Sequence, residues 1–278
     1  MQAISARGLR KTYGPTTALA GVDIDIAPGE AVAIMGASGS GKTTLLHALA
    51  GIVTPDVGAV HLATPMGVVD VARLSDAERT RLRRERFGFV FQEGMLVPEL
   101  TAVENVALAL MLVGAPRASA IQEAAMWLGS LGLAGMEDRR IGQLSGGQAQ
   151  RVAIARAQVT GASIVFADEP TGALDSVTSA EVMSALLSAT VGRGRTLVLV
   201  THDEQVAARC SRVVRMRDGL LVDAGAGAAG APAASPQPAG TLAPPAPGTA
   251  VAAPHPAYGT PAAPRVPLTT EQQWQVRA

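Results

Sequence analysis

One glycine-rich stretch constrains this chain more than any other feature. Residues 36–43 read Gly-Ala-Ser-Gly-Ser-Gly-Lys-Thr, after an apolar run from Ala31 to Met35 and before a helix-like run from Thr43 to Ala50. A strand, a glycine loop and a helix in this order bind phosphate, because backbone N–H groups and the positive end of the helix dipole converge on the anion. The stretch predicts an α/β fold with a nucleotide phosphate site.

The positions of this loop have distinct expected roles. We expect Lys42 to reach the β and γ oxygens of a nucleotide, and Thr43 to offer its hydroxyl to Mg²⁺. The residues expected to contact the nucleotide here are Gly36, Ala37, Ser38, Gly39, Ser40, Gly41, Lys42, Thr43 and Thr44.

Short apolar runs rich in Val, Ile or Phe indicate buried strands. Between them lie helix-like windows, such as the one in which Ile121, Ala125, Leu128 and Gly132 recur at helical spacing. Strands that alternate with helices predict a largely parallel sheet. The expected strands of this core are residues 31–35, 87–91, 163–167, 196–201 and 213–216.

Two other zones differ from this core. Residues 4–11, 22–26 and 58–62 alternate apolar with polar side chains, which is typical of half-exposed antiparallel strands. Residues 101–160, by contrast, contain no convincing strand. We therefore predict a P-loop NTPase fold: a parallel-sheet core, an N-terminal antiparallel β subdomain, and an α-helical insert at about residues 93–160.

The composition changes near Ala224. Residues 1–223 are expected to form the folded domain, and residues 224–278 an Ala/Pro/Gly-rich disordered tail, because residues 225–267 cannot bury enough apolar surface to offset their chain entropy. A polyproline ligand is the alternative for this stretch. The last residues regain Trp274 and Val276 and have a short docking helix as their alternative.

Charge, cysteine content and hydropathy limit the partners and the compartment. Lys plus Arg and Asp plus Glu both number 23, so no overall field favours nucleic acid. The single cysteine, Cys210, suits a reducing compartment and a buried, inert role. The start of the chain lacks a signal-peptide pattern, and the apolar stretch Val106 to Ala115 has about half the length of a membrane span. Membrane association is thus expected to run through a partner protein.

A pair of carboxylates follows the expected strand at residues 163–167. Asp168 stands where a strand tip delivers charge to a ligand crevice, and we expect it to hold Mg²⁺ directly or through water. Glu169 is expected to point elsewhere, since side chains alternate along a strand, and to polarise the attacking water. Taken alone, such a pair is as often a helix cap or solvated charge.

A pentapeptide decides between these interpretations. Residues 144–148 read Leu-Ser-Gly-Gly-Gln and directly precede a helix-like run from Ala149 to Gln158. With it the chain resembles the ATP-binding-cassette ATPases, whose signature this sequence matches in full. The resemblance extends from Ile4 to about Asp223 and implies that residues 1–223 are an ABC transporter ATP-binding domain. Further family motifs follow the same order, namely Tyr13, the glutamine-loop Gln92, the D-loop at residues 173–175 and the switch histidine His202.

The resemblance implies a role for each motif. Tyr13 would stack on adenine, although a structural tyrosine at a strand end is the alternative. Gln92 would offer an oxygen to Mg²⁺ or bind the attacking water, and His202 would reach the γ-phosphate. The implied catalytic residues are Glu169, His202 and Lys42; the implied Mg²⁺ ligands are Thr43, Gln92 and Asp168; the signature residues implied to contact ATP are Ser145, Gly146, Gly147 and Gln148.

The resemblance also implies partners. In this family two copies face each other, and each ATP lies between the phosphate loop of one and the signature of the other. A permease subunit then converts opening and closing of the dimer into transport. The chain would accordingly sit on the cytoplasmic face of the inner membrane, attached through the permease.

Three segments are similar to one branch of the family, which includes lipoprotein-releasing, macrolide-exporting and cell-division ATPases. These segments are residues 73–84, 87–92 and 96–106. An exporter or mechanotransmission system is the predicted function, and a cell-division ATPase that regulates a wall hydrolase is the alternative. Residues 93–95 depart from the bulky residues of many relatives, at the place implied to touch the permease, so the substrate is left open. A DNA-repair ATPase would need coiled coils or zinc inserts that the sequence lacks, and an inactive regulator would be expected to lack Glu169 and His202.

Overall fold

The computed structural model describes residues 2–223. The tail predicted at residues 224–278, including Trp274 and the segment around it, lies outside the described residues. The predictions made for that part of the chain stay predictions.

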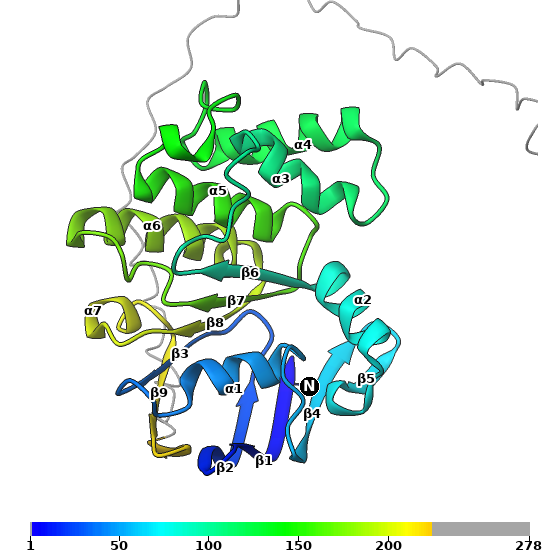
Figure 1. The fold of residues 1–278 in the computed structure, drawn as a ribbon, viewed down its shortest axis with the longest axis vertical. Coiled ribbons are helices and arrows are strands. Elements are labelled where there is room, and N and C mark those ends of the chain that lie inside the picture. The colour runs from blue at the N-terminus through cyan, green and yellow to red at the C-terminus, as the bar shows by residue number, and fades with distance from the viewer. Residues whose placement is uncertain (1, 224–278) are drawn as a thin grey trace, which may run out of the picture. The chain divides into compact units, whose positions relative to one another are not determined.

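The N-terminal part forms a four-stranded antiparallel sheet in the order β2-β1-β4-β5 (Figure 1). In β1, Ile4, Ala6 and Leu9 are buried while residues between them face outward, as the alternating sequence predicts. The predicted antiparallel zone is confirmed, with strands longer than expected. The strands are β1 (Ile4–Tyr13), β2 (Thr16–Ile26), β4 (Val57–Thr64) and β5 (Gly67–Asp70).

The second sheet has the order β10-β9-β3-β8-β7-β6, in which only β10 runs antiparallel to its neighbour. All five residues of β8 are buried, which explains the run of four apolar residues that follows Thr196. The predicted core strands agree to within one or two residues at each end. They are β3 (Ala31–Gly36), β6 (Phe87–Phe91), β7 (Ile164–Asp168), β8 (Thr196–Val200) and β9 (Arg212–Arg217), and the edge strand β10 (Leu220–Asp223) was not predicted.

Helix α1 (Lys42–Leu49) lies between the two sheets (Figure 1). Leu45, Leu46 and Leu49 are fully buried and share one apolar cluster with residues of both sheets. The start of this helix is therefore fixed by packing on two sides. Because the phosphate loop of residues 36–41 joins β3 to this helix, both ends of the loop are held by the core.

Helices cover the other face of the second sheet. Helices α5 and α6 lie next to it, and α3 and α4 lie farther out (Figure 1). Within residues 101–160 the only β-type pairing is one isolated bridge, from Thr101 to Arg140, so the predicted helical insert is confirmed. These helices are α3 (Ala102–Met111), α4 (Arg117–Ser130), α5 (Gly146–Gln158) and α6 (Ser176–Ala189).

The helix-like window around Ile121, Ala125 and Leu128 forms α4, and these side chains pack on the core to different depths. Ala120, Ala124 and Leu128 are fully buried, whereas Ile121 and Ala125 are only partly buried. The predicted Gly132 lies beyond the helix, with φ of 74°. Alanines occur on several faces of this helix, so the sequence alone does not show which face is the more deeply buried.

Two further helices are short or exposed. Helix α2 (Asp76–Arg86) begins at the cap residue Ser75 and has no buried residue, as its arginine-rich sequence predicts. Its Arg83 donates a hydrogen bond to the carbonyl of Gly51. Helix α7 (Glu204–Ala207) has a single turn.

The turn between β9 and β10 braces the phosphate loop. The N–H of Gly219 lies 3.1 Å from the carbonyl oxygen of Ser40, and the carbonyl of Gly219 accepts a hydrogen bond of 2.9 Å from the N–H of Ala20. One residue of the hairpin thus connects the loop with strand β2.

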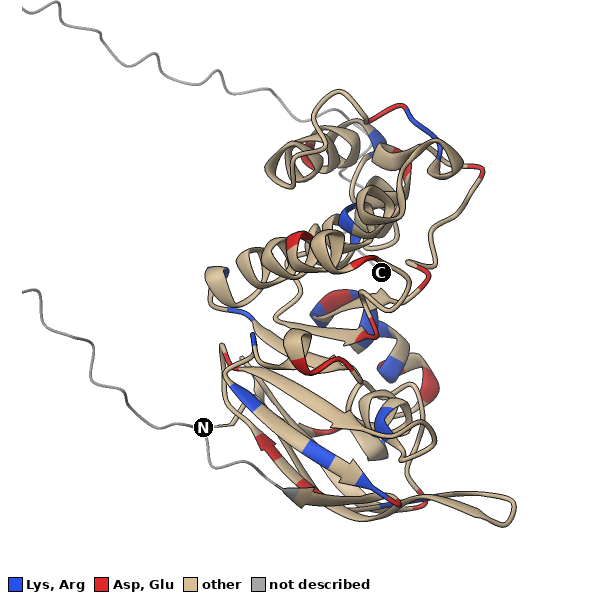
Figure 2. Ribbon diagram, turned by 90° about the vertical axis from the view of Figure 1, so that its left-hand side faces the viewer, with Lys and Arg blue, Asp and Glu red and all other residues tan. Residues whose placement is uncertain are grey.

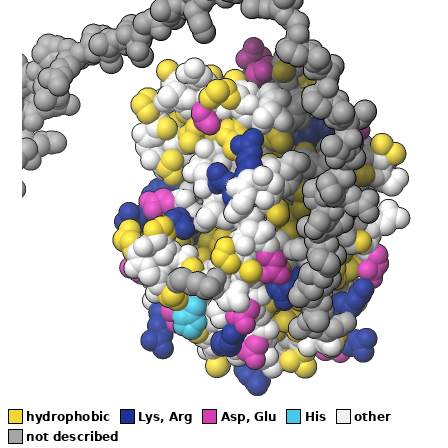
Figure 3. Space-filling model, turned by 180° about the vertical axis from the view of Figure 1, so that it is seen from behind, with side chains coloured by type: hydrophobic (Ala, Val, Ile, Leu, Met, Phe, Trp, Pro, Cys, Tyr) yellow, Lys and Arg dark blue, Asp and Glu magenta, His cyan; other side chains and the backbone are white. Residues whose placement is uncertain are grey.

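The surface carries charges of both signs. Basic and acidic residues are interspersed over the strands and helices (Figure 2), and the side seen in Figure 3 mixes apolar with charged side chains. Burial raises the pKa of the Cys210 thiol to about 12, in agreement with an inert cysteine. None of the helices between residues 2 and 223 is long and apolar enough to cross a membrane.

Candidate functional site

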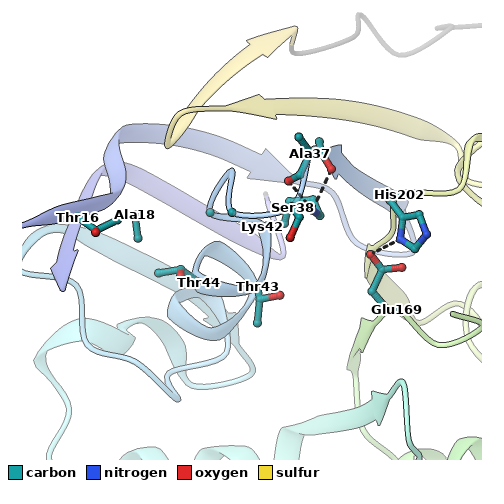
Figure 4. A pocket seen from close by; sticks show the side chains of 12 residues that line it. Thr16, Ala18, Ala37, Ser38, Lys42, Thr43, Thr44, Glu169 and His202 are labelled. Carbon is teal, nitrogen blue, oxygen red and sulfur yellow. Dashed lines mark hydrogen bonds and ion pairs between the residues drawn. The ribbon is translucent and has the colours of Figure 1, made fainter. Parts of the chain in front are cut away.

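A cavity of about 630 Å³ opens beside the end of β3 (Figure 4). The structure brings together there the glycine loop, the start of α1, Glu169 and His202. Two residues of β2, Thr16 and Ala18, were missed by the sequence analysis because neither side chain carries a recognisable chemical signal. The full lining consists of Thr16, Ala18, Gly36, Ala37, Ser38, Gly39, Gly41, Lys42, Thr43, Thr44, Glu169 and His202.

The glycine loop fits closely against its surroundings. Gly41 has φ of 100°, and a Cβ atom there would lie 2.2 Å from the carbonyl oxygen of Ala18. Only glycine meets both conditions. The ammonium of Lys42 lies 2.9 Å from the carbonyl oxygens of Gly36 and Ala37, so it is folded back on its own loop (Figure 4).

Thr43 lines this cavity and contacts Asp168, which lies outside the lining. The hydroxyl of Thr43 donates to Oδ1 of Asp168 at 3.2 Å. Burial raises the pKa of Asp168, while the hydrogen bond from Thr43 acts in the opposite direction. A hydroxyl and a carboxylate are hard oxygen donors, the kind that Mg²⁺ prefers in phosphate sites. The residues present therefore fit this ion.

Glu169 and His202 lie next to each other at one side of the cavity (Figure 4). Nδ1 of His202 lies 2.9 Å from Oε1 of Glu169. The backbone of Glu169 is left-handed, with φ of 48°, and its N–H donates to the carbonyl of Val200. Strand β7 has already ended at Asp168, so the turn, and not the alternation along a strand that we predicted, gives Glu169 its separate direction.

Gln92 lies outside the cavity lining but is linked to it. A Cβ atom at Gly172 would lie 3.1 Å from Nε2 of Gln92, so the amide rests against the backbone of that glycine. The N–H of Gly172 in turn donates to the carbonyl of Glu169 at 3.0 Å. Gly172 is a third residue that the sequence did not reveal, because its importance depends on a contact with a distant segment.

Tyr13 ends strand β1 and is 49% exposed. It does not line the cavity itself but pairs across the hairpin with Thr16, which does. The ammonium of Lys11 lies 5.6 Å from the centre of its ring. Asp56 binds this ammonium at 2.7 Å and also accepts hydrogen bonds from the N–H and hydroxyl of Thr12. These three contacts lower the pKa of Asp56 to about 2.

The signature residues 145–148 lie apart from the cavity of their own chain. The hydroxyl of Ser145 accepts from the N–H of Gln148, whose side chain accepts from the N–H of Ser145 at 2.9 Å. The helix predicted from Ala149 thus begins earlier, with both glycines in its first turn; low intrinsic helix propensity hid this start. Ser145 and Gly146 are exposed.

Comparison with known proteins agrees with this geometry. A profile of the family described as ABC transporter matches residues 19–172. The macrolide export ATP-binding/permease protein MacB of Nitrosomonas europaea is 47% identical over 224 residues, which cover 79% of this chain and 33% of MacB. The pyoverdine export ATP-binding/permease protein PvdT of Pseudomonas aeruginosa shows the same identity and coverage. The chain thus spans about a third of the length of the curated relatives it matches.

Solved structures show the same fold. A dimeric post-hydrolysis state of the ATP-binding cassette MJ0796, bound to ADP and Pi, has a TM-score of 0.72 and 38% identity, and the match covers 79% of this chain and 97% of that one. A second dimeric structure of MJ0796, described as a bacterial ABC transporter cassette, matches equally well. The expected likeness to macrolide-exporter ATPases is confirmed by the two export proteins. This chain belongs to the ABC transporter family, as one of its ATP-hydrolysing cassettes.

Proposed function

We propose that two copies of this chain enclose two molecules of MgATP and hydrolyse them to drive a permease, in an export or mechanotransmission system. The binding energy of ATP closes the dimer, and hydrolysis reopens it. The chain would act at the cytoplasmic face of the membrane, attached through the permease.

The exposed signature is the observation that carries this proposal. Ser145 and Gly146 stand at the N-terminal end of α5, where backbone N–H groups and the helix dipole favour an anion. They do not line the cavity of their own chain, which already has a phosphate loop. A second copy, related by two-fold symmetry, would bring its signature to the open side of that cavity. The dimeric solved cassettes support this arrangement.

The residues of the cavity have complementary proposed roles. Lys42 would leave its own loop carbonyls for the phosphate oxygens, and Tyr13 would support the adenine. Glu169, held by His202, would orient the attacking water, and His202 would stabilise the charge that develops on the γ-phosphate. Thr43 and Asp168 would hold Mg²⁺, with Gln92 approaching from its turn; the ion would neutralise charge on the phosphates.

A groove next to Gln92 is the proposed place of the permease. It has a volume of about 580 Å³, and Ile52, Leu112 and Phe91 give it an apolar lining beside arginines of α2. Ile52 and Leu112 are both largely exposed. The family resemblance puts permease contact just after Gln92, and the curated relatives MacB and PvdT are named as ATP-binding/permease proteins.

The test compares the wild-type chain with Glu169→Gln. Both would be purified, assayed for Mg²⁺-dependent ATP hydrolysis, and run on size-exclusion chromatography with and without ATP. We expect the wild type to turn over, and the variant to retain ATP and elute as a dimer, because the amide cannot accept a proton from water while the binding surfaces are unchanged.

Two results would overturn the proposal. A variant that hydrolyses ATP at the wild-type rate would remove Glu169 from the reaction. The second result is a Glu169→Gln chain that stays monomeric although ATP saturates its site and its signature is intact. That result would contradict the proposed ATP-bound dimer. Ser145→Arg is the matched control for the second point, since it blocks the exposed signature without touching residues that line the cavity.

A further inference from the structure

The turn that contains Gln92 is held by one side chain from α5. Nη1 of Arg156 lies 2.6 Å from the carbonyl oxygen of Met95, and Nη2 lies 2.7 Å from that of Gly94. The two carbonyls are consecutive, so the planar guanidinium binds a single turn with both arms. Such forked, charged hydrogen bonds are stronger and more directional than single neutral ones.

This turn has an unfavourable backbone. Gly94 has φ of 67° and Met95 has φ of 46°. Glycine adopts this left-handed region freely, but for methionine it costs on the order of 1–2 kcal/mol. The side chain of Met95 is 64% exposed, so its own packing offsets little of that cost. Contacts made by other residues must therefore hold the turn.

No carboxylate in the described part of the chain competes for Arg156. Within residues 2–223 it forms no ion pair with a carboxylate. Its pKa is lowered because burial removes water from the guanidinium. A desolvated charge needs polar contacts in its place. The carbonyls of Gly94 and Met95 supply them, so the arginine and the turn depend on each other.

The turn is continuous with the reacting groups. Its first residue, Phe91, accepts at its carbonyl from the N–H of Gly94 at 2.9 Å and from Nε2 of Gln150 at 2.8 Å. Gln92 follows directly, and its amide rests against Gly172, whose N–H binds the carbonyl of Glu169. A shift of the turn would thus move the Gln92 amide relative to Glu169.

We propose that Arg156 is a positioning residue: by holding Gly94 and Met95 left-handed, it sets the place of Gln92 beside the reacting phosphate. This inference rests on the proposed function of Gln92 as a contact of Mg²⁺ or of the attacking water. Helix α5, which begins with the signature, thereby carries the support for the glutamine loop of the same chain.

The experiment uses the full chain with Arg156→Lys, Met95→Asn and the double variant. Lysine keeps the charge and the aliphatic stem but lacks the two-armed fork. Asparagine tolerates the left-handed region, so it lessens the need for the grip. Arg151→Lys is the matched control, because Arg151 lies on the same helix and contacts Glu181 at 3.4 Å instead of the turn.

Hydrogen–deuterium exchange and ATP hydrolysis would be measured on each protein. We expect Arg156→Lys to exchange about tenfold faster in peptides covering residues 92–97, with other peptides unchanged. Its kcat should fall about tenfold while KM for ATP stays within about twofold, as for a lost transition-state contact. Met95→Asn in the same chain should restore most of both losses, and Arg151→Lys should show neither.

Unchanged exchange at residues 92–97 in Arg156→Lys would overturn the inference. Faster exchange throughout the chain, without rescue by Met95→Asn, would also overturn it, because Arg156 would then have only a general structural role. Gln92→Ala, measured in parallel, separates this inference from the proposed function. If Gln92→Ala hydrolyses ATP normally, the role of Gln92 fails, whereas the exchange data still decide whether Arg156 holds the turn.

Discussion

Gly147 and Thr178 are in such close contact that a Cβ atom at Gly147 would lie 2.4 Å from Cγ2 of Thr178. The first turns of α5 and α6 therefore meet at a glycine. Its neighbour Gly146 is similarly close to Leu174, at 3.0 Å from a Cβ to the leucine Cδ2. The signature and the D-loop accordingly form one packed unit, in addition to the proposed role of the signature at the phosphate.

Gly147→Ala should push α5 and α6 apart. Overpacking of this kind destabilises by about 1–3 kcal/mol, which lowers Tm by several degrees in a domain of this size. Thr178→Ser removes Cγ2 but keeps the hydroxyl that binds Asp175 at 2.7 Å, so the double variant should regain the lost Tm. Thermal denaturation measures both effects, and a double variant as unstable as Gly147→Ala would contradict this account of the contact.

Asp56→Asn should weaken ATP binding more than it slows hydrolysis. The carboxylate holds Lys11 and Thr12, next to Tyr13, so its loss frees the tyrosine proposed to support adenine. We expect Kd for ATP to rise about threefold to tenfold, or roughly 0.6–1.4 kcal/mol. Asp25→Asn is the control, because Asp25 pairs with Arg7 in the same sheet without touching residues 11–13. Equal effects of the two variants, measured by equilibrium titration, would refute the link to Tyr13.

The same carboxylate predicts a pH dependence. Its pKa is lowered from 3.8 to about 2, chiefly by the hydrogen bond from Lys11, so the folded chain favours the ionised form. The stabilisation from this group is complete above about pH 4 and is lost as the pH falls toward 2. Carboxyl chemical shifts measured by NMR would report the midpoint. A midpoint near the ordinary value of Asp would show that the contacts with Lys11 and Thr12 do not persist in solution.

Gln158→Leu should stabilise the chain. The side chain of Gln158 is 1% exposed, and neither of its polar atoms has a hydrogen-bond partner among the described residues. A buried, unpaired amide costs about 1–3 kcal/mol, and leucine has a similar volume. Gln150→Leu is the control on the same helix, because Gln150 is equally buried but binds the carbonyl of Phe91. Denaturant unfolding should move in opposite directions for the two variants; a parallel loss would disprove the unpaired state of Gln158.

Much of the fold was predictable from sequence because its signals are local. The glycine loop at residues 36–43 has a distinctive motif, and the strand at residues 196–200 has a continuous apolar run after Thr196, so the local sequence indicates both. The start of α5 was not predictable in this way. Gly146 and Gly147 are unfavourable in a helix and are kept there by contact with α6, which only the tertiary structure reveals.

The residues of the candidate site likewise fall into those that the local sequence reveals and those that only tertiary contacts reveal. Side chains with distinctive chemistry, such as Lys42, Asp168 and His202, could be picked from motifs. Supporting residues could not. Arg156 binds the backbone carbonyl of Gly94, 62 positions earlier in the chain, and Gly172 contacts the side chain of the distant Gln92. The residue type alone does not indicate which distant segment such a residue contacts.

The hairpin at Gly219 sets a practical boundary on engineering this protein. Its hydrogen bonds to Ser40 and Ala20 join the phosphate loop to the last turn before strand β10. A shortened chain that stops before residue 219 would lose this link, while one that stops after Asp223 would keep it. A force applied through a fusion at residue 223 would act four residues after Gly219, which is hydrogen-bonded to the phosphate loop. Attaching this end of the cassette to a surface or a force probe would therefore be expected to disturb the nucleotide site.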